Sequence, residues 1–164
     1  MTPHRRIWIG ALAGSALGAR WALAAPAEPG TPVTWPQVRL LDGSDWGAQQ
    51  AQGKAVVVVF WSTTCPFCKR HNAHVDKLRQ QAAGRPLELI TVARDTDPQA
   101  VRRYLAQHGW NFAVTLEQGP MRAALSMRNV IPLTVTVDRK GRLKQVFPGE
   151  MFEEDVLELL QLAG

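Results

Sequence analysis

Two cysteines separated by two residues are the clearest candidates for chemistry in this sequence. Cys65 and Cys68 are the only cysteines of the chain, and Pro66 and Phe67 lie between them. A thiolate attacks a disulfide to form a mixed disulfide, so a neighbouring second thiol can complete the exchange. A disulfide between residues this close constrains almost no loop, which favours a chemical rather than a stabilising purpose for the pair.

Other cysteine chemistries fit the surrounding residues less well. A zinc ribbon needs a second pair of ligands, and the chain has no further cysteine. Covalent haem attachment needs a histidine directly after the second cysteine, where Lys69 stands. A metal-binding or copper-chaperone protein is the alternative function, because Cys65, Cys68 and His71 follow one another at a spacing of three and soft thiolates hold Cu(I) or zinc. His74 continues the same spacing.

The elements around the pair would place Cys65 at the start of a helix. Residues 55–61 form an uninterrupted apolar run, which is typical of a strand buried on both faces of a parallel sheet. The sequence from Pro66 to Ala82 predicts a helix, because proline suits the first helical position. A helix start stabilises a thiolate and lowers the pKa of a cysteine there. These features favour Cys65 as the nucleophile and place Cys68 one turn inside, within reach of it.

The remaining pattern alternates strands and helices and ends with a hairpin and a last helix. A helix starts with Asp97 as its cap and ends at Gly109. Further strands are expected at 38–41, 87–93, 112–115, 133–137 and 143–147, and further helices at 120–127 and from 153 onward. This order predicts an α/β domain with a mixed sheet.

The first 24 residues are typical of an export signal that is cleaved. A basic start with Arg5 and Arg6 precedes an apolar run, and Ala22–Ala24 matches the small-x-small cleavage pattern. The arginine pair fits a twin-arginine signal as well as general secretion. An uncleaved membrane anchor is the alternative, although Arg20 would interrupt its span. Residues 25–32 then form a proline-rich linker, and residues 33–164 form the folded domain.

Removal of the signal changes the charge of the protein. The segment carries Arg5, Arg6 and Arg20 and no acidic residue, so its loss lowers the formal net charge from +5 to +2. The mature chain therefore lacks the strongly basic character of nucleic-acid-binding proteins, and no nucleic-acid partner is expected.

Between residues 38 and 160 the sequence resembles the TlpA/ResA branch of thioredoxin-like proteins, which are exported bacterial thiol–disulfide oxidoreductases. The resemblance rests on the segments Leu41–Gly43, Gly53–Lys54, Phe60–Trp61, Val92–Asp95, Ile131–Thr134 and Val137–Gly141. It implies a thioredoxin fold with a mixed central sheet flanked by helices, an N-terminal strand extension and a strand–helix insertion. The insertion would lie between Asp97 and Met127.

The resemblance also implies roles for individual residues. Cys65 would be the attacking thiol and Cys68 the resolving thiol. Pro132 would follow a cis peptide bond and face the two sulfurs, and the backbone of Ile131 would pair with an incoming substrate strand. The other expected substrate contacts are Trp61, Pro66 and Phe67.

The activity that the resemblance implies is that of a protein-disulfide reductase in the periplasm. It would serve cytochrome c maturation or the assembly of a metal centre. Its partners would be client proteins with disulfides or thiols and a membrane thiol-electron donor. We expect a monomer that uses no cofactor and no metal beyond the redox-active Cys65–Cys68 disulfide. A net oxidase stays open, because Pro66–Phe67 replaces the Gly-Pro pair of thioredoxins and resembles more oxidising members.

The sequence departs from the family next to the second cysteine. Val59 stands where thioredoxins carry a buried acid, and His71 stands where this branch commonly has glutamate. His71 shares a helical stripe with Val75 and Leu78, so it is expected to face the core one turn from Cys68. Two interpretations follow. His71 is either an acid–base group of near-neutral pKa that exchanges the proton of Cys68, or a packing histidine at a contact between helix and loop.

Overall fold

The structure, a computed structural model, describes residues 28–126 and 128–164 and is built on a five-stranded mixed sheet. The strand order is β5-β4-β3-β6-β7, with bounds Ala113–Thr115, Leu87–Ala93, Ala55–Trp61, Leu133–Val137 and Leu143–Pro148. β3, β4 and β5 run parallel, whereas β6 and β7 are antiparallel to their neighbours. The predicted mixed sheet is thereby confirmed. The expected signal at 1–24, the linker up to residue 27 and Met127 lie outside the described residues.

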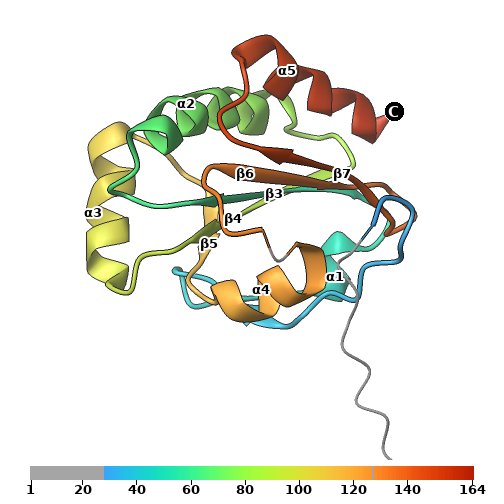
Figure 1. Cartoon of the computed structure of the whole chain (residues 1–164), viewed down its shortest axis with the longest axis horizontal. Helices are drawn as coiled ribbons and strands as arrows, with labels where there is room; N and C mark the ends of the chain where they lie inside the picture. The colour runs from blue at the N-terminus through green and yellow to red at the C-terminus, as the bar shows by residue number, and fades with distance from the viewer. Residues whose placement is uncertain (1–27, 127) are drawn as a thin grey trace, which may run out of the picture.

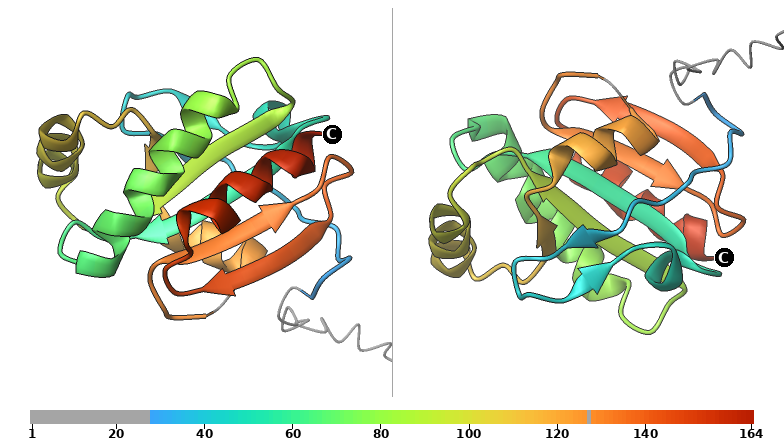
Figure 2. Two further views of the ribbon diagram at one scale, coloured as in Figure 1. Left: turned by 90° about the horizontal axis from the view of Figure 1, so that it is seen from above. Right: turned by 90° about the horizontal axis from the view of Figure 1, so that it is seen from below.

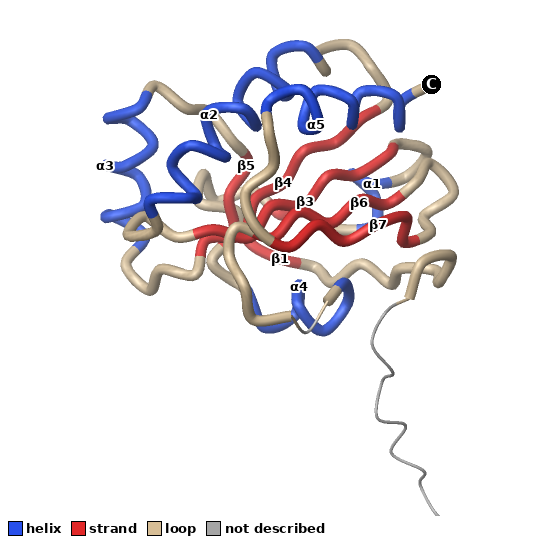
Figure 3. Tube along the Cα trace, turned by 45° about the horizontal axis from the view of Figure 1, so that its top comes forward, coloured by secondary structure: helices blue, strands red, loops and turns tan. Residues whose placement is uncertain are grey.

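Helices cover both faces of the sheet (Figures 1 and 3). α2 (Pro66–Gln81) and α5 (Glu153–Glu158), which a 3-10 segment continues through Leu159–Ala163, lie on one face. α4 (Gln118–Leu125) and the short α1 (Ala48–Ala51) lie on the other face.

The N-terminal strands and α3 complete the fold. β1 (Val38–Arg39) and β2 (Asp45–Trp46) form a separate antiparallel pair, which crosses the sheet on the side of α4 (Figure 2). α3 (Pro98–His108) stands at the end of the molecule near β5 (Figure 1). Its N-cap is Asp97, whose side chain accepts a hydrogen bond from the Gln99 N–H at 2.8 Å, and it ends at Gly109 in the left-handed region. Both boundaries agree with the sequence prediction.

β3 packs against the elements on both faces of the sheet, and its seven side chains are all buried. Alternate residues point to opposite faces of a strand, so one half of them packs against α2 and α5 and the other half against the layer of β1, β2 and α4. The first set is Val57, Val59 and Trp61, and the second is Val56, Val58 and Phe60. The uninterrupted apolar run therefore reflects burial on both sides.

Two small elements, β2 and α1, are not predicted by the sequence pattern. Each is too short to show a periodic pattern, since β2 has two residues and α1 has four. α1 is held locally by the side chain of Gln50, whose Oε1 accepts a hydrogen bond from the Gly47 N–H at 2.9 Å. The expected helix at 120–127 is also displaced, because α4 begins at Gln118 and ends at Leu125.

Strand pairing brings three distant segments to one end of the sheet. β3 ends just before the loop that leads to Cys65, and its Phe60 pairs with Leu133 of β6. Leu133 in turn pairs with Pro148 at the end of β7. The segment that carries the cysteines, the segment before β6 and the segment after β7 therefore meet at this end. Within the described part of the chain, no helix is long and apolar enough to cross a bilayer.

Candidate active site

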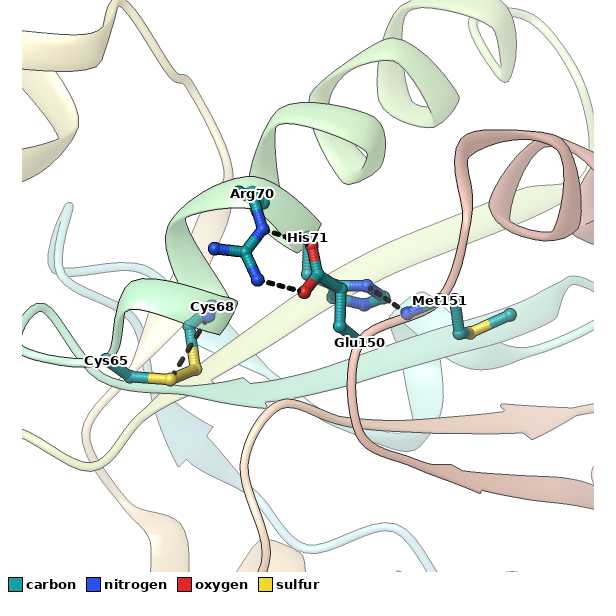
Figure 4. Close-up of polar contacts among 6 residues, drawn as sticks. All are labelled: Cys65, Cys68, Arg70, His71, Glu150 and Met151. Carbon is teal, nitrogen blue, oxygen red and sulfur yellow. Dashed lines mark hydrogen bonds and ion pairs between the residues drawn. A yellow bond between two sulfur atoms is a disulfide. The ribbon is translucent and has the colours of Figure 1, made fainter.

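Cys65 and Cys68 form a disulfide at the N-terminus of α2. Cys65 is the N-cap residue, and its Sγ accepts a hydrogen bond from the Cys68 N–H at 3.1 Å (Figure 4). Pro66 occupies the first helical position, where its missing N–H costs nothing. Cys65 is half-buried and Cys68 is fully buried. Of the two cysteines, only Cys65 therefore keeps surface that a partner can reach.

The loop before Cys65 is anchored to the end of β4. The Asp95 carboxylate accepts a hydrogen bond from the Thr63 N–H at 3.1 Å and another from the Thr63 hydroxyl. The Arg94 N–H donates to the Trp61 carbonyl at 2.8 Å. These contacts hold the backbone that presents Cys65, so Asp95 is a positioning residue that the sequence analysis did not single out. The available signal was its place two residues after the end of β4, the parallel strand next to β3.

The Ile131–Pro132 peptide bond is cis, as the family resemblance implied. Pro132 is buried, and its carbonyl accepts a hydrogen bond from the Gly149 N–H at 2.8 Å. The backbone N–H and C=O of Ile131 have no hydrogen-bond partner among residues 28–126 and 128–164. This segment thus keeps main-chain groups available at the end of the sheet where the disulfide lies.

His71 is fully buried and uses both ring nitrogens. Its Nδ1 accepts a hydrogen bond from the Met151 N–H at 3.3 Å, and its Nε2 lies 2.9 Å from the Thr134 hydroxyl oxygen. An Nδ1 that accepts leaves the proton of the neutral ring on Nε2, which then donates to Thr134. The side chain therefore joins α2 to β6 through Thr134 and to the segment after β7 through Met151, the second contact being drawn in Figure 4.

The prediction of a near-neutral pKa for His71 is wrong. Burial, followed by the influence of His74, lowers the pKa of His71 to about 4, against a weaker opposing effect of Glu150. The ring is therefore neutral near pH 7, and a base with so low a pKa is a weak acceptor for a thiol proton. The geometry corresponds to the other interpretation, a packing histidine at a contact between helix and loop.

An ion pair beside the disulfide ties α2 to the same segment. Arg70 Nε and one terminal nitrogen donate to the two oxygens of the Glu150 carboxylate at 2.8 and 2.6 Å. The pKa of Glu150 is lowered chiefly by the hydrogen bond from Arg70. The guanidinium also lies over the Phe67 ring, 5.1 Å from its centre. The segment from Gly149 to Met151 therefore contacts the segment of Pro132 and two successive residues of α2.

The expected substrate contacts fall into two groups. Pro66 and Phe67 are exposed beside the disulfide. Trp61 is fully buried and packs against Tyr104 of α3, with ring centres 5.6 Å apart. The prediction that Trp61 contacts the substrate directly is corrected, because its side chain lies in the core and is covered by α3.

The alternative of a metal site finds little support in the geometry. The Nδ1 and Nε2 atoms of His71 face Met151 and Thr134. Among residues 28–126 and 128–164, no group of three or more histidine, cysteine or acidic side chains is arranged to hold a metal ion.

Asn72 is a buried polar residue that was not among the predicted site residues. It is fully buried, and neither its amide nitrogen nor its amide oxygen has a hydrogen-bond partner within the described residues. It lies four positions after Cys68 on α2, which places the two side chains on one row of the helix surface. That spacing was the signal in the sequence.

Comparison with known proteins identifies a family for this arrangement. Residues 28–160 match the Redoxin family model. The sequence is 27% identical over 122 residues to the thiol-disulfide oxidoreductase ResA of Halalkalibacterium halodurans. The aligned region covers 74% of this chain and 69% of that protein. ResA of Geobacillus kaustophilus is 26% identical over 118 residues, covering 71% of this chain and 67% of that protein.

Solved structures show the same fold. A thiol:disulfide interchange protein of the thioredoxin family from Chlorobium tepidum superimposes with a TM-score of 0.73 at 23% identity, over 85% of this chain and 99% of that one. A secreted Mycobacterium tuberculosis disulfide oxidoreductase, homologous to E. coli DsbE, gives a TM-score of 0.67 at 18% identity, over 77% and 94% of the two chains. The predicted thioredoxin fold is thereby confirmed.

Proposed function

Because the chain belongs to the Redoxin family and is a thiol–disulfide oxidoreductase, we propose that it reduces disulfides in exported client proteins. The observation that carries the proposal is the asymmetry of the pair. Cys65 is half-buried at the start of α2, and Cys68 is fully buried behind it. This arrangement suits one thiol that meets the client and a second that acts only within the protein.

The proposed reaction begins with the reduced pair. The thiolate of Cys65, stabilised by the start of the helix, attacks one sulfur of the client disulfide. A bond forms between Cys65 and that sulfur, and the other client sulfur leaves as a thiolate. Cys68, as its thiolate, then attacks the sulfur of Cys65 and releases the first client sulfur. The client gains two electrons, and the Cys65–Cys68 disulfide is formed.

The segment around Pro132 completes the proposed site. The client strand would pair with the free backbone groups of Ile131, beside the half-buried Cys65. The Gly149–Pro132 hydrogen bond and the contacts of His71 hold this segment and the start of α2 in one arrangement. His71 thus acts as a positioning residue in the proposal.

The location and the pathway belong to the same proposal. Residues 1–24 would be the export signal, residues 25–32 a linker and residues 33–164 the domain, which would act as a monomer in the periplasm. Each turnover leaves the pair oxidised, so a membrane thiol-electron donor would have to restore the dithiol. Cytochrome c maturation or the assembly of a metal centre would supply the clients.

The reduction potential of the Cys65–Cys68 pair tests the direction of electron flow. Equilibration with dithiothreitol or glutathione buffers measures it directly. A value near that of thioredoxin, about −270 mV, is expected for a reductase. A value near about −120 mV, as in strongly oxidising members of the fold, would instead make the protein a net oxidase.

A further inference from the structure

Asn72 is a buried polar side chain for which the oxidised protein has no use. It is fully buried, and neither of its amide atoms has a hydrogen-bond partner among residues 28–126 and 128–164. A buried amide without hydrogen bonds destabilises a fold, whereas an apolar side chain of similar size does not. We therefore looked for a state of the protein in which this amide is bonded.

The helix places Asn72 beside Cys68. It lies four positions after Cys68 on α2, and side chains at this spacing have their Cβ atoms about 5–6 Å apart. Side chains of an α-helix also lean toward its N-terminus. The amide at the end of the Asn72 side chain therefore leans over the turn that carries Cys68.

Cys68 needs a hydrogen-bond donor only when the disulfide is open. In the oxidised protein its Sγ is bonded to Cys65, and the Cys68 N–H donates to the Sγ of Cys65 (Figure 4). To attack a mixed disulfide on Cys65, Cys68 must become a thiolate. It is fully buried in the same apolar cluster as Val59, and a buried thiolate without a hydrogen bond is unfavourable.

The ionisable groups on the elements around the disulfide already have partners or are exposed. On α2, His71 is hydrogen-bonded to Thr134 and Met151, and Lys69 is exposed. The carboxylates that come from other elements accept hydrogen bonds from their own partners, which are Arg70 for Glu150 after β7 and Thr63 for Asp95 after β4.

Two other polar groups without partners lie on the side of α3. They are the Trp61 Nε1 and the Tyr104 hydroxyl, which also find no hydrogen bond within the described part of the chain. Their rings pack against each other, and Tyr104 borders a hollow with Cys65. Asn72 alone of the three lies on the helix of Cys68, one turn away from it. Tyr104 is therefore the comparison for Asn72.

We propose that the side-chain amide of Asn72 donates a hydrogen bond to the Sγ of Cys68 when the disulfide opens and stabilises the thiolate that resolves the mixed disulfide. Asn72 is thus a catalytic residue of the second step of exchange. It transfers no proton, because the amide keeps both of its hydrogens and a buffer base takes the proton of Cys68. When the disulfide closes, the thiolate is consumed and the amide is left without a partner, as in the oxidised protein.

This inference rests on one part of the proposed function, the role of Cys68 as the resolving thiol. It holds for either direction of electron flow, because exchange in both directions passes through the same mixed disulfide.

Single-turnover reaction of the reduced protein with dithionitrobenzoate separates the two steps. Attack by Cys65 releases one thionitrobenzoate, and Cys68 then releases the second from the mixed disulfide. Absorbance follows both releases from pH 5 to 9. In Asn72→Leu, the midpoint of the pH profile of the second release should rise by about one pH unit. The first release should keep its wild-type rate.

The same variant should also resolve the mixed disulfide more slowly at pH 7. A rise of about one pH unit makes the thiolate about tenfold rarer below the midpoint, but a more basic thiolate is also more nucleophilic. We therefore expect the second release to be about threefold slower.

Two further variants test whether the donor itself is responsible. Asn72→Ala also lacks the donor but leaves a space, so it should raise the midpoint as Asn72→Leu does. Tyr104→Phe removes another buried hydroxyl without a partner and should keep the wild-type midpoint. Circular dichroism verifies that each variant is folded. A midpoint that rises in only one of the two Asn72 variants, or that rises equally in Tyr104→Phe, overturns the inference.

The outcomes also separate the inference from the proposed function. If the wild-type protein gives the first release but not the second, Cys68 is not the resolving thiol, and the proposed function and the inference fail together. If the second release has the same midpoint in the wild-type protein and in both Asn72 variants, the role of Cys68 stands and Asn72 takes no part in it.

Discussion

The Nε2 atom of His71 lies 2.9 Å from the hydroxyl oxygen of Thr134, and this contact joins α2 to β6 beneath the active site. Thr134 pairs in register with Val59 of β3, the position where thioredoxins carry a buried acid. The polar group on this side of the core thus comes from α2 and β6 rather than from β3. His71 Nδ1 also accepts a hydrogen bond from the Met151 N–H, so the folded protein holds the ring in its neutral form.

The burial of a neutral His71 predicts how stability depends on pH. Its pKa is about 4 in the folded protein, against 6.5 for an ordinary histidine, chiefly because of burial. Between these values the unfolded chain binds more protons, so the free energy of unfolding should fall as the pH is lowered from about 6.5 to about 4. Over this range His71 alone should lower the free energy of unfolding by about 3 kcal/mol. Urea unfolding at several pH values measures it.

His71→Gln supplies the comparison for that experiment. Glutamine cannot titrate in this range, so this variant should lose the His71 part of the pH dependence even if it is less stable at pH 7. His74 and Glu150, which influence His71, remain in both proteins. If the free energies of unfolding of the two proteins changed in parallel between pH 4 and 6.5, the pH dependence would not come from His71.

The second prediction concerns proton transfer to Cys68. With a pKa near 4 and both ring nitrogens occupied, His71 should not set the pH dependence of mixed-disulfide resolution. We expect His71→Gln to lower the rate through loss of positioning and to leave the midpoint of the pH profile unchanged. Single-turnover kinetics from pH 5 to 9 measure both quantities. A displaced midpoint would restore the proton-exchange role.

The third prediction follows from the unequal burial of the two cysteines. In the reduced protein, Cys65 should react with iodoacetamide much faster than Cys68, because Cys68 is fully covered. Cys68→Ser should accumulate mixed disulfides with clients, and Cys65→Ser should not. Mass spectrometry of the labelled protein and non-reducing electrophoresis provide the readouts. Equal labelling of both thiols, or the reverse trapping pattern, would refute the order of attack.

The fourth prediction concerns the unpartnered amide of Asn72. A buried amide without hydrogen bonds destabilises the fold by about 1–3 kcal/mol, so Asn72→Leu, of similar size, should stabilise the oxidised protein by a similar amount. Urea unfolding at pH 7 measures the change. Asn72→Ala is the control, since it removes the amide but leaves a space. A large loss of stability in Asn72→Leu would mean that the amide is satisfied in solution.

Local sequence signals predicted the parts of the fold that depend on neighbouring residues. The apolar run at 55–61 can only be buried on both faces, and Pro66 and Asp97 mark helix starts through local backbone chemistry. The spacing of Cys65 and Cys68 at such a start was enough to indicate disulfide exchange. These features depend on residues within one or two turns of each other, so they can be predicted from sequence.

The surroundings of His71 and Trp61 depend on contacts that no local pattern contains. The partners of His71 lie 63 and 80 residues further along the chain, and their burial of the ring is what lowers its pKa. Trp61 is covered by Tyr104 of α3, so a residue next to the active-site loop became part of the core. The orientation and desolvation of a side chain are set only when distant segments pack together. The tertiary structure alone therefore decided which residues beside the disulfide a partner can reach.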